Sequence, residues 1–208
     1  MIIYDITLPL RSDIAVWPGD VPFTLNRTLS IATGSPVNLG SITLSVHAGT
    51  HMDAPYHLDA DGATAETIDL SVCIGPAVVI DVSGITEISC QDLAASDIER
   101  SPRVLLKTGA WTNLAVFPDD VPTLAPDVPE YLSNRGVKLL GIDVPSVDKI
   151  HSKDLPIHKE LIRCGITILE SLYLADTPGG RYELIALPLK VVGADGAPMR
   201  AILKGITG

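Results

Sequence analysis

Three short apolar runs rich in Val, Ile and Leu limit most strongly what this chain can fold into. They lie at residues 77–82, 104–107 and 137–142. A strand that is covered on both faces has a continuous apolar run, whereas a half-buried strand alternates apolar and polar residues. We therefore expect these three runs to form the central strands of a sheet that is buried on both sides.

Short helices are expected between the strands. Ser89 and Asp92 form a capping-box pattern that predicts a helix through Ser96. Residues 126–135 are predicted to be helical, because Gly136 suits the left-handed position that ends a helix. Residues 158–164 are predicted to form a third helix, which Gly165 ends. The order of elements favours a mixed α/β fold in which the sheet dominates.

The remaining strands are predicted at residues 2–8, 166–170, 182–189 and 199–203. Residues 23–29 and 41–46 alternate apolar and polar side chains, so they are predicted to be half-buried strands. The chain has 208 residues, of which 46% are apolar, and this is enough for a buried core. We expect one α/β domain that spans residues 1–208.

Charge and cysteine content exclude several classes of protein. The 15 basic and 25 acidic residues give a net charge of −10 without any basic run, which argues against nucleic-acid binding. No apolar run reaches the ~18 residues of a membrane span, and the first residues do not resemble a signal peptide. Cys73, Cys90 and Cys164 are odd in number and far apart, so no disulfide framework is expected. These features predict a cytoplasmic protein.

Three of the five histidines lie within eleven residues of each other. Together with one aspartate they are the side-chain types that bind divalent metal ions such as zinc. All four occupy odd-numbered positions, so a straight strand would present their side chains on the same face. These residues are His47, His51, Asp53 and His57.

A straight strand would nevertheless hold these side chains too far apart. Four extended residues span roughly 13 Å, whereas two ligand atoms of one metal lie about 3–4 Å apart. The chain must therefore bend between His47 and His51, and Gly49 permits such a bend. Pro55 favours an extended backbone at Ala54. Spacing and residue type are consistent both with a metal site and with a solvated surface loop.

The string from residue 47 to residue 57 resembles the HxGTHxDxPxH motif of the cyclase family of metal-dependent hydrolases. Every fixed position of that motif is filled. The resemblance covers nearly the whole chain and is closest to the formamidase branch; further similar segments are residues 16–20, 36–45, 141–148, 168–170 and 182–189. It implies a fold of the swivelling β/β/α type and a homodimer.

The resemblance also implies two divalent metal ions in each subunit. His47, His51 and Asp53 would bind the first ion, Asp53 and His158 the second, and Glu170 would bridge the two. The imidazole ligands favour Zn²⁺, although the carboxylates would also accept Mn²⁺. His57 would be the catalytic acid and base rather than a ligand.

Some of these residues have simpler interpretations from the sequence alone. Glu170 could be the solvated end of a strand, and His158 could be an exposed helix residue. Formamidases have two adjacent histidines where this chain has His158 and Lys159. The replacement leaves open which side chains support His158 as a ligand. His151 matches no ligand position and is expected on the surface.

The resemblance implies hydrolysis of a small aryl formamide, N-formyl-L-kynurenine, to L-kynurenine and formate. His57 would protonate the departing aniline nitrogen, and the loop residue Trp17 would stack on the aryl group. The chain lacks the GxSxG string of a serine hydrolase. Two alternatives are a relative that opens a cyclic amide such as isatin and a metal-binding module without turnover. The presence of His57 argues against the second, since binding alone needs no proton relay.

Overall fold

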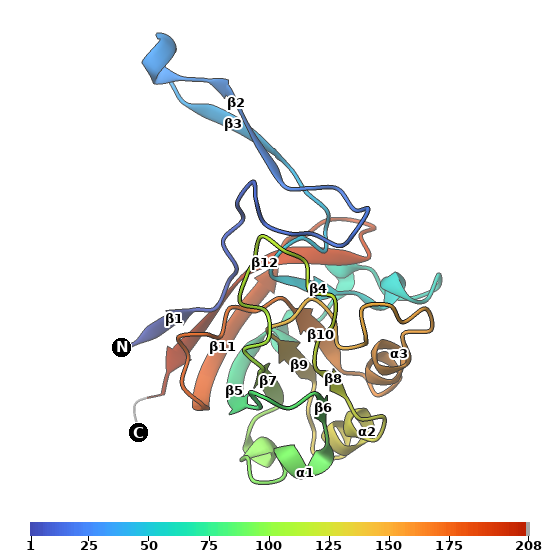
Figure 1. The fold of residues 1–208 in the computed structure, drawn as a ribbon. Coiled ribbons are helices and arrows are strands. Elements are labelled where there is room, and N and C mark those ends of the chain that lie inside the picture. Colours follow the sequence, from blue (N-terminus) through green and yellow to red (C-terminus); the bar gives the residue numbers. More distant parts are fainter. Residues whose placement is uncertain (207–208) are drawn as a thin grey trace.

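Eight strands form one mixed sheet in the computed structural model, which describes residues 1–206. The strand order is β1-β12-β11-β5-β7-β9-β10-β4 (Figure 1). β4 also pairs with β12, so seven of the strands close into a ring, and β1 lies outside it on β12. The bounds are β1 (Ile3–Asp5), β4 (His51–Asp53), β5 (Ile74–Asp81), β7 (Arg103–Lys107), β9 (Leu139–Ile142), β10 (Thr167–Glu170), β11 (Gly180–Pro188) and β12 (Gly196–Gly205).

The three apolar runs form neighbouring parallel strands β5, β7 and β9, as predicted. Their successive side chains enter two different buried clusters. Val104 and Leu106 pack in the cluster beneath the helices, whereas Leu105 packs in the cluster enclosed by the ring of strands. Both faces of β7 are therefore shielded from solvent, which explains why the side chains of this strand form a continuous apolar run.

Three helices, α1 (Cys90–Leu93), α2 (Val128–Ser133) and α3 (Pro156–Arg163), lie on the outer side of the ring (Figure 1). The predicted capping box of α1 is formed by Ser89 and Asp92, but the helix ends at Leu93, before the predicted Ser96. Gly136 and Gly165 follow α2 and α3 in left-handed conformations, with φ of 77° and 69°. The apolar sides of α2 and α3 complete the outer cluster.

Short elements connect these parts. A two-stranded parallel sheet pairs β6 (Glu87–Ile88) with β8 (Thr123–Leu124). Single turns of 3-10 helix occupy Ile31–Thr33, Pro55–His57, Ala65–Thr67, Leu70–Val72 and Ile98–Arg100. None of the helices within residues 1–206 has the length and apolar character required to cross a bilayer.

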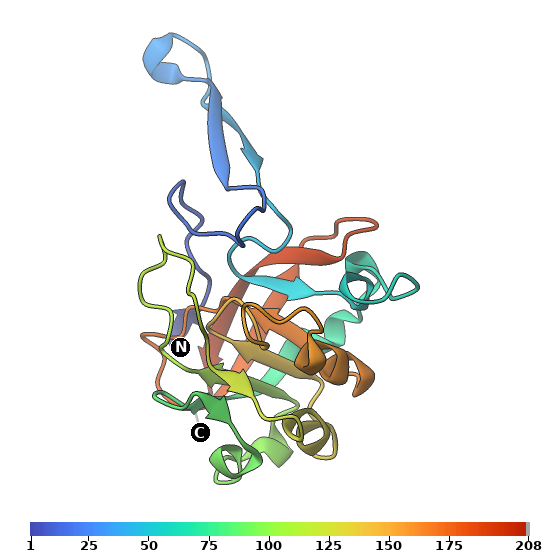
Figure 2. The same cartoon turned by 45° about the vertical axis from the view of Figure 1, so that its right-hand side comes forward.

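Strands β2 (Thr24–Leu29) and β3 (Leu39–Thr43) form a hairpin that projects away from the ring (Figures 1 and 2). The prediction of half-buried strands is wrong, because every residue of both strands is exposed. Leu25 and Ile42 are paired across the hairpin and are 54% and 56% exposed. The alternating pattern correctly indicates strands at residues 24–29 and 41–43, but no other described part of the chain covers the apolar side chains of this hairpin.

Candidate metal centre and substrate pocket

The histidine-rich segment bends as its spacing predicts. Residues 46–50 form a turn, and β4 begins directly afterwards at His51. Gly49 occupies the turn with a φ of +66°, and a Cβ there would lie 2.8 Å from a Leu10 methyl group. Ala54 is extended, as expected before a proline, and Pro55 then begins a turn of 3-10 helix. The bend brings the side chains of one strand and one loop to a common point.

Three of the predicted ligands form a first triad. His47 Nδ1 lies 3.0 Å and His51 Nε2 lies 3.4 Å from Asp53 Oδ1. His51 Nδ1 is 2.8 Å from the carbonyl oxygen of Gly49, which can only accept a hydrogen bond. The proton of neutral His51 is therefore on Nδ1, and the lone pair of Nε2 faces the triad. That is the arrangement that a metal-binding imidazole requires.

The other carboxylate oxygen of Asp53 belongs to a second triad. His158 Nε2 lies 3.5 Å from Asp53 Oδ2 and 3.1 Å from Glu170 Oε1. His158 and Glu170 are each only 4% exposed, so the interpretations as an exposed helix residue and a solvated strand end are wrong. Lys159 points outward and is exposed, so its departure from the family pattern leaves this triad intact.

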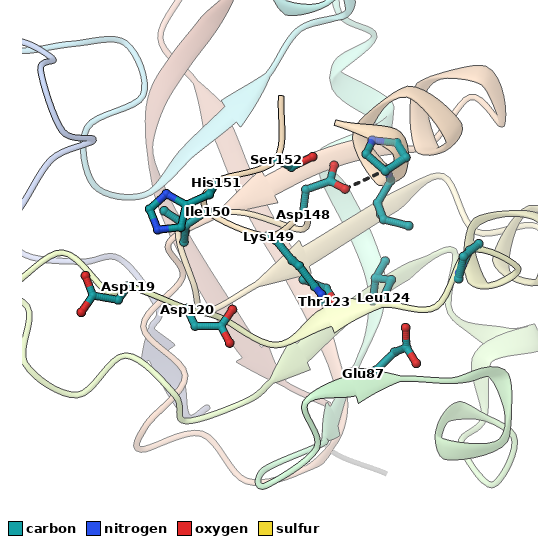
Figure 3. Close-up of a pocket in the computed structure, with 13 residues that line it drawn as sticks. Glu87, Asp119, Asp120, Thr123, Leu124, Asp148, Lys149, Ile150, His151 and Ser152 are labelled. Carbon is teal, nitrogen blue, oxygen red and sulfur yellow. Dashed lines mark hydrogen bonds between the residues drawn. The ribbon is translucent and has the colours of Figure 1, made fainter. Parts of the chain in front are cut away.

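Asp148, to which the sequence assigns no role, orients His158. Its Oδ2 accepts hydrogen bonds from the backbone N–H of His158 at 3.0 Å and from His158 Nδ1 at 2.7 Å. Its Oδ1 accepts the backbone N–H of Ile157 at 3.1 Å, the hydrogen bond drawn from Asp148 in Figure 3. One carboxylate therefore caps the start of α3 and selects the tautomer of His158. Leu155, just before the helix, has a left-handed φ of 45°.

The buried atoms of the two triads fit divalent metal ions. Among the described residues 1–206, His51 Nε2 and Asp53 Oδ2 are buried without any hydrogen-bond partner. A buried polar atom without a partner costs about 1–3 kcal/mol, and metal coordination removes that cost. Imidazole nitrogens and carboxylate oxygens are suitable donors for such an ion. Three groups of side chains could each hold an ion: the two triads, His47–His51–Asp53 and Asp53–His158–Glu170, and the less buried group His47–His57–Asp195.

Charge helps to hold the side chains of the two triads together. Burial lowers the pKa of His47, but hydrogen bonds and charges from Asp53 and Asp195 outweigh it and raise that pKa to about 9. The pKa of His158 is also raised well above its usual value, because Asp148, Asp53 and Glu170 outweigh its burial. Burial opposes ionisation of Asp53, yet the three histidines hold its pKa well below the usual range. At neutral pH, metal ions must therefore displace protons from these ligands.

We expect the affinity for Zn²⁺ to rise with pH between about 6.5 and 9. The raised pKa of His47 means that protonated imidazole is lost only as the pH approaches 9, so protons compete with metal below that value. Affinity should increase by up to about tenfold per pH unit for each proton displaced. Competition with a chromophoric chelator at several pH values measures this slope. An affinity that does not change with pH would contradict the assignment of His47 as a ligand.

A cavity of about 350 Å³ opens above the triads. His47, His51, His158 and Glu170 line its floor, and aromatic side chains line its wall. The ring of Phe117 lies between two tryptophans, with centroids 5.2 Å from Trp17 and 6.2 Å from Trp111, in edge-to-face orientations. The cavity can accommodate a flat aromatic molecule with a polar end directed at the triads.

Trp17 lies on a loop, as predicted, and its side chain reaches this wall. Trp111 and Phe117 were missed, because they belong to an irregular segment almost one hundred residues away from Trp17. Asp143 holds the start of that segment by accepting the backbone N–H groups of Thr108 and Gly109 at 3.0 and 2.9 Å. No pattern in the sequence indicates that these three rings meet.

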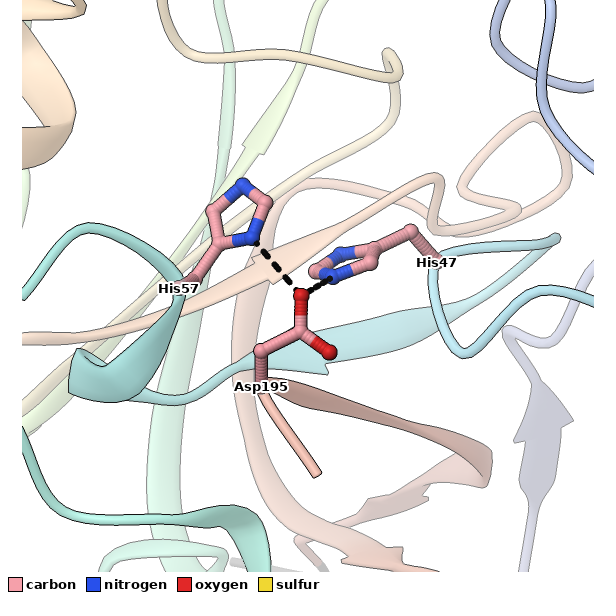
Figure 4. A group of neighbouring side chains, drawn as sticks. All are labelled: His47, His57 and Asp195. Atoms are coloured by element: carbon pink, nitrogen blue, oxygen red, sulfur yellow. Dashed lines mark hydrogen bonds and ion pairs between the residues drawn. The ribbon is translucent and has the colours of Figure 1, made fainter. Parts of the chain in front are cut away.

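His57 lies beside the triads without belonging to either of them. Its ring centroid is 4.3 Å from that of His47, and its side chain is partly exposed to the cavity. His57 Nδ1 lies 3.2 Å from Asp195 Oδ2, and His47 Nε2 lies 3.0 Å from the same oxygen (Figure 4). Asp195 is a second residue that the sequence analysis did not identify.

His151 lies outside the cluster, in agreement with the surface position expected for it. It is exposed and lines a separate cavity of about 480 Å³ together with Asp119, Asp120 and Lys149 (Figure 3). Asp148, which also contacts His158, lines this cavity too.

Comparison with known proteins agrees with this geometry. Residues 4–149 match the putative cyclase family. The chain is 48% identical over 200 residues to the kynurenine formamidase of Geobacillus thermodenitrificans, covering 96% of each chain. A solved structure described as a potential metal-dependent hydrolase with cyclase activity is 33% identical, with a TM-score of 0.79 over 97% of this chain and 96% of the other. Isatin hydrolase A from Labrenzia aggregata, bound to benzyl benzoate, is 25% identical, with a TM-score of 0.81 over 97% and 92%.

Proposed function

The chain belongs to the cyclase family, and we propose that it is a kynurenine formamidase, which hydrolyses N-formyl-L-kynurenine to L-kynurenine and formate. The similarity to a kynurenine formamidase over almost the entire length of both chains carries this proposal. An aromatic-walled cavity above two His/Asp/Glu triads agrees with it, because the substrate joins an aryl ring to a hydrolysable formyl group.

Two metal ions per subunit are part of the proposal. His47, His51 and Asp53 would hold one, and Asp53 and His158 the other. Glu170 would serve both, since its Oε1 lies 3.1 Å from His158 Nε2 and its Oε2 lies 3.6 Å from His51 Nε2. Mostly imidazole ligands favour Zn²⁺, and the carboxylates also permit Mn²⁺. When bound, such ions supply activation of water and polarisation of the formyl carbonyl.

The protein's own side chains orient the substrate and move the proton. The wall formed by Trp17, Trp111 and Phe117 would hold the aryl ring, so that the formyl group points to the floor of the cavity. His57 Nδ1 faces Asp195, which leaves Nε2 as the atom available to the substrate. Nε2 can first take a proton from the attacking water molecule and then give it to the aniline nitrogen, which leaves poorly unless it is protonated.

Turnover assays on two substrates test the function. We expect rapid hydrolysis of N-formyl-L-kynurenine, followed by its absorbance change, and a far smaller kcat/KM for isatin. Isatin is the relevant competitor, because an isatin hydrolase shares the fold with a TM-score of 0.81. A larger kcat/KM for isatin would replace the formamidase assignment with that of a cyclic amide hydrolase. Metal binding without turnover of either compound would favour the non-catalytic alternative.

We expect Trp17→Ala mainly to raise KM. An aromatic pair contributes about 0.5–1.5 kcal/mol beyond burial, which corresponds to roughly 2- to 13-fold in affinity. Trp17 is 40% exposed, so its removal should change the free energy of unfolding little. Steady-state kinetics and thermal unfolding measure the two quantities. An unchanged KM with a large fall in Tm would identify Trp17 as a structural residue.

The projecting hairpin supports the proposal of a homodimer, whereas the swivelling β/β/α type of the fold stays a proposal from the family resemblance. Leu25 and Ile42 are adjacent on the hairpin and more than half exposed, and a second copy of the chain would cover them. We expect the wild-type chain to have twice the 22.0 kDa monomer mass in light scattering, and Leu25→Asp with Ile42→Asp to yield monomers. A monomeric wild-type protein would contradict the homodimer.

A further inference from the structure

Asp195 lies in the turn that enters β12, held against the metal-binding segment by backbone contacts. Its carbonyl oxygen accepts the backbone N–H of Ala54 at 2.9 Å, and the next residue, Gly196, is paired with Asp53. On the other side of the turn, Gly193 donates its backbone N–H to Glu66 at 3.1 Å. The position of the Asp195 carboxylate relative to Asp53 is therefore set by the main chain.

The adjacent glycine leaves room for the ring of His47. A Cβ on Gly196 would lie 2.7 Å from Cε1 and 3.0 Å from Nε2 of His47. Real Cβ atoms do not approach a ring so closely, so any larger residue would push the imidazole away. The Cε1–Nε2 edge of the His47 ring therefore packs against Gly196, and its Nε2 contacts the Asp195 carboxylate.

The Asp195 carboxylate contacts two imidazoles through one oxygen. Its Oδ2 lies 3.0 Å from His47 Nε2 and 3.2 Å from His57 Nδ1, as Figure 4 shows. An ionised carboxylate only accepts hydrogen bonds, so both of these nitrogens donate their protons to it. The opposite nitrogens, His47 Nδ1 and His57 Nε2, are then the ones left for a metal ion and for the substrate.

We propose that Asp195 is a positioning residue that fixes the tautomer and orientation of both the ligand His47 and the acid–base residue His57. The inference rests on the proposed function for the role of His57, and on the first triad for that of His47. A carboxylate behind a metal-binding imidazole commonly improves metal affinity or activity by about 10- to 100-fold. Here the Asp195 carboxylate orients both the proposed metal ligand His47 and the proposed acid–base residue His57.

Histidine-selective nitrogen-15 NMR on the full chain tests the tautomers directly. The protein has five histidines, so His47→Ala and His57→Ala suffice to assign the two signals. We expect a proton on His57 Nδ1 and on His47 Nε2 in the zinc-loaded wild type, and a mixture of His57 tautomers in Asp195→Ala. A wild-type His57 with its proton on Nε2 would overturn the proposal without reference to any activity.

Metal affinity and kinetics of two variants give the second readout. Asp195→Ala should lower Zn²⁺ affinity, measured against a chelator, and kcat at saturating zinc by about 10- to 100-fold each. In Asp195→Asn the losses of Zn²⁺ affinity and of kcat should be smaller. The amide oxygen can occupy the position of Oδ2 and accept the hydrogen bonds from His47 and His57. Asp61→Asn, which removes an exposed charge from a nearby loop, is the matched control and should match the wild type.

The remaining outcomes separate this proposal from the proposed function. If Asp195→Ala keeps wild-type zinc affinity and wild-type kcat, Asp195 has no positioning role. Equal losses in Asp195→Ala and Asp195→Asn with a lowered Tm would make the residue structural and also overturn the proposal. If the wild type does not hydrolyse N-formyl-L-kynurenine, the proposed function fails, while the tautomers and zinc affinity still decide the role of Asp195.

Discussion

Asp53→Ala should lose nearly all bound metal and nearly all formamidase activity. The two oxygens of Asp53 belong to different triads, so this one substitution removes a ligand from each. Both sites then lose a ligand and a negative charge at once, so we expect both to bind metal weakly. Elemental analysis of protein purified without chelator measures the metal content, and turnover of N-formyl-L-kynurenine measures the activity.

His158→Ala is the matched comparison, because His158 belongs to the second triad alone. Its metal content should fall from two ions per chain towards one. Full metal occupancy in Asp53→Ala would refute the ligand assignment, and a wild-type content of one ion per chain would refute the binuclear arrangement.

His57→Ala should keep its metal ions and its fold but lose about 10²- to 10⁴-fold in kcat. General acid–base catalysis commonly contributes that much, and His57 lies beside the triads without taking part in either. The loss should be smaller for aryl formamides with electron-withdrawing ring substituents, since such an aniline departs with less help from an acid. Steady-state kinetics over a series of ring-substituted formanilides measures this dependence.

Two results would contradict this role. Loss of metal from His57→Ala would make His57 a ligand. An equal loss of kcat for every leaving group would show that His57 does not protonate the departing nitrogen. Circular dichroism and metal analysis of the same preparation separate both results from misfolding.

Local rules allowed much of the fold and of the metal loop to be predicted. The central strands followed from apolar runs at residues 77–82, 104–107 and 137–142, because a strand buried on both faces admits no polar alternation. The bend at Gly49 followed from the extent of an extended chain compared with the size of a metal site. The resemblance added His158 and Glu170, which no local pattern distinguishes from surface residues.

Other features depend on residues that meet only after folding. Asp195 is an ordinary loop aspartate in the sequence, and Asp148 is distinguished only as the end of the family-like segment 141–148. Both acquire their contacts with histidines through the path of the main chain. The aromatic wall of the cavity likewise joins distant segments.

By itself the sequence indicated most of the segments that become strands, although not the short strands β4, β6 and β8. It also indicated where the histidine-rich segment bends and which side chains have suitable chemistry for metal ions. These properties depend on neighbouring residues, through backbone sterics and the alternation of side chains. Only the tertiary structure decided that β2 and β3 are exposed, that Trp17 meets Phe117, and that Asp195 lies behind two histidines. Burial and long-range contact are properties of the whole packed chain, so the same local pattern can end in the core or in solvent.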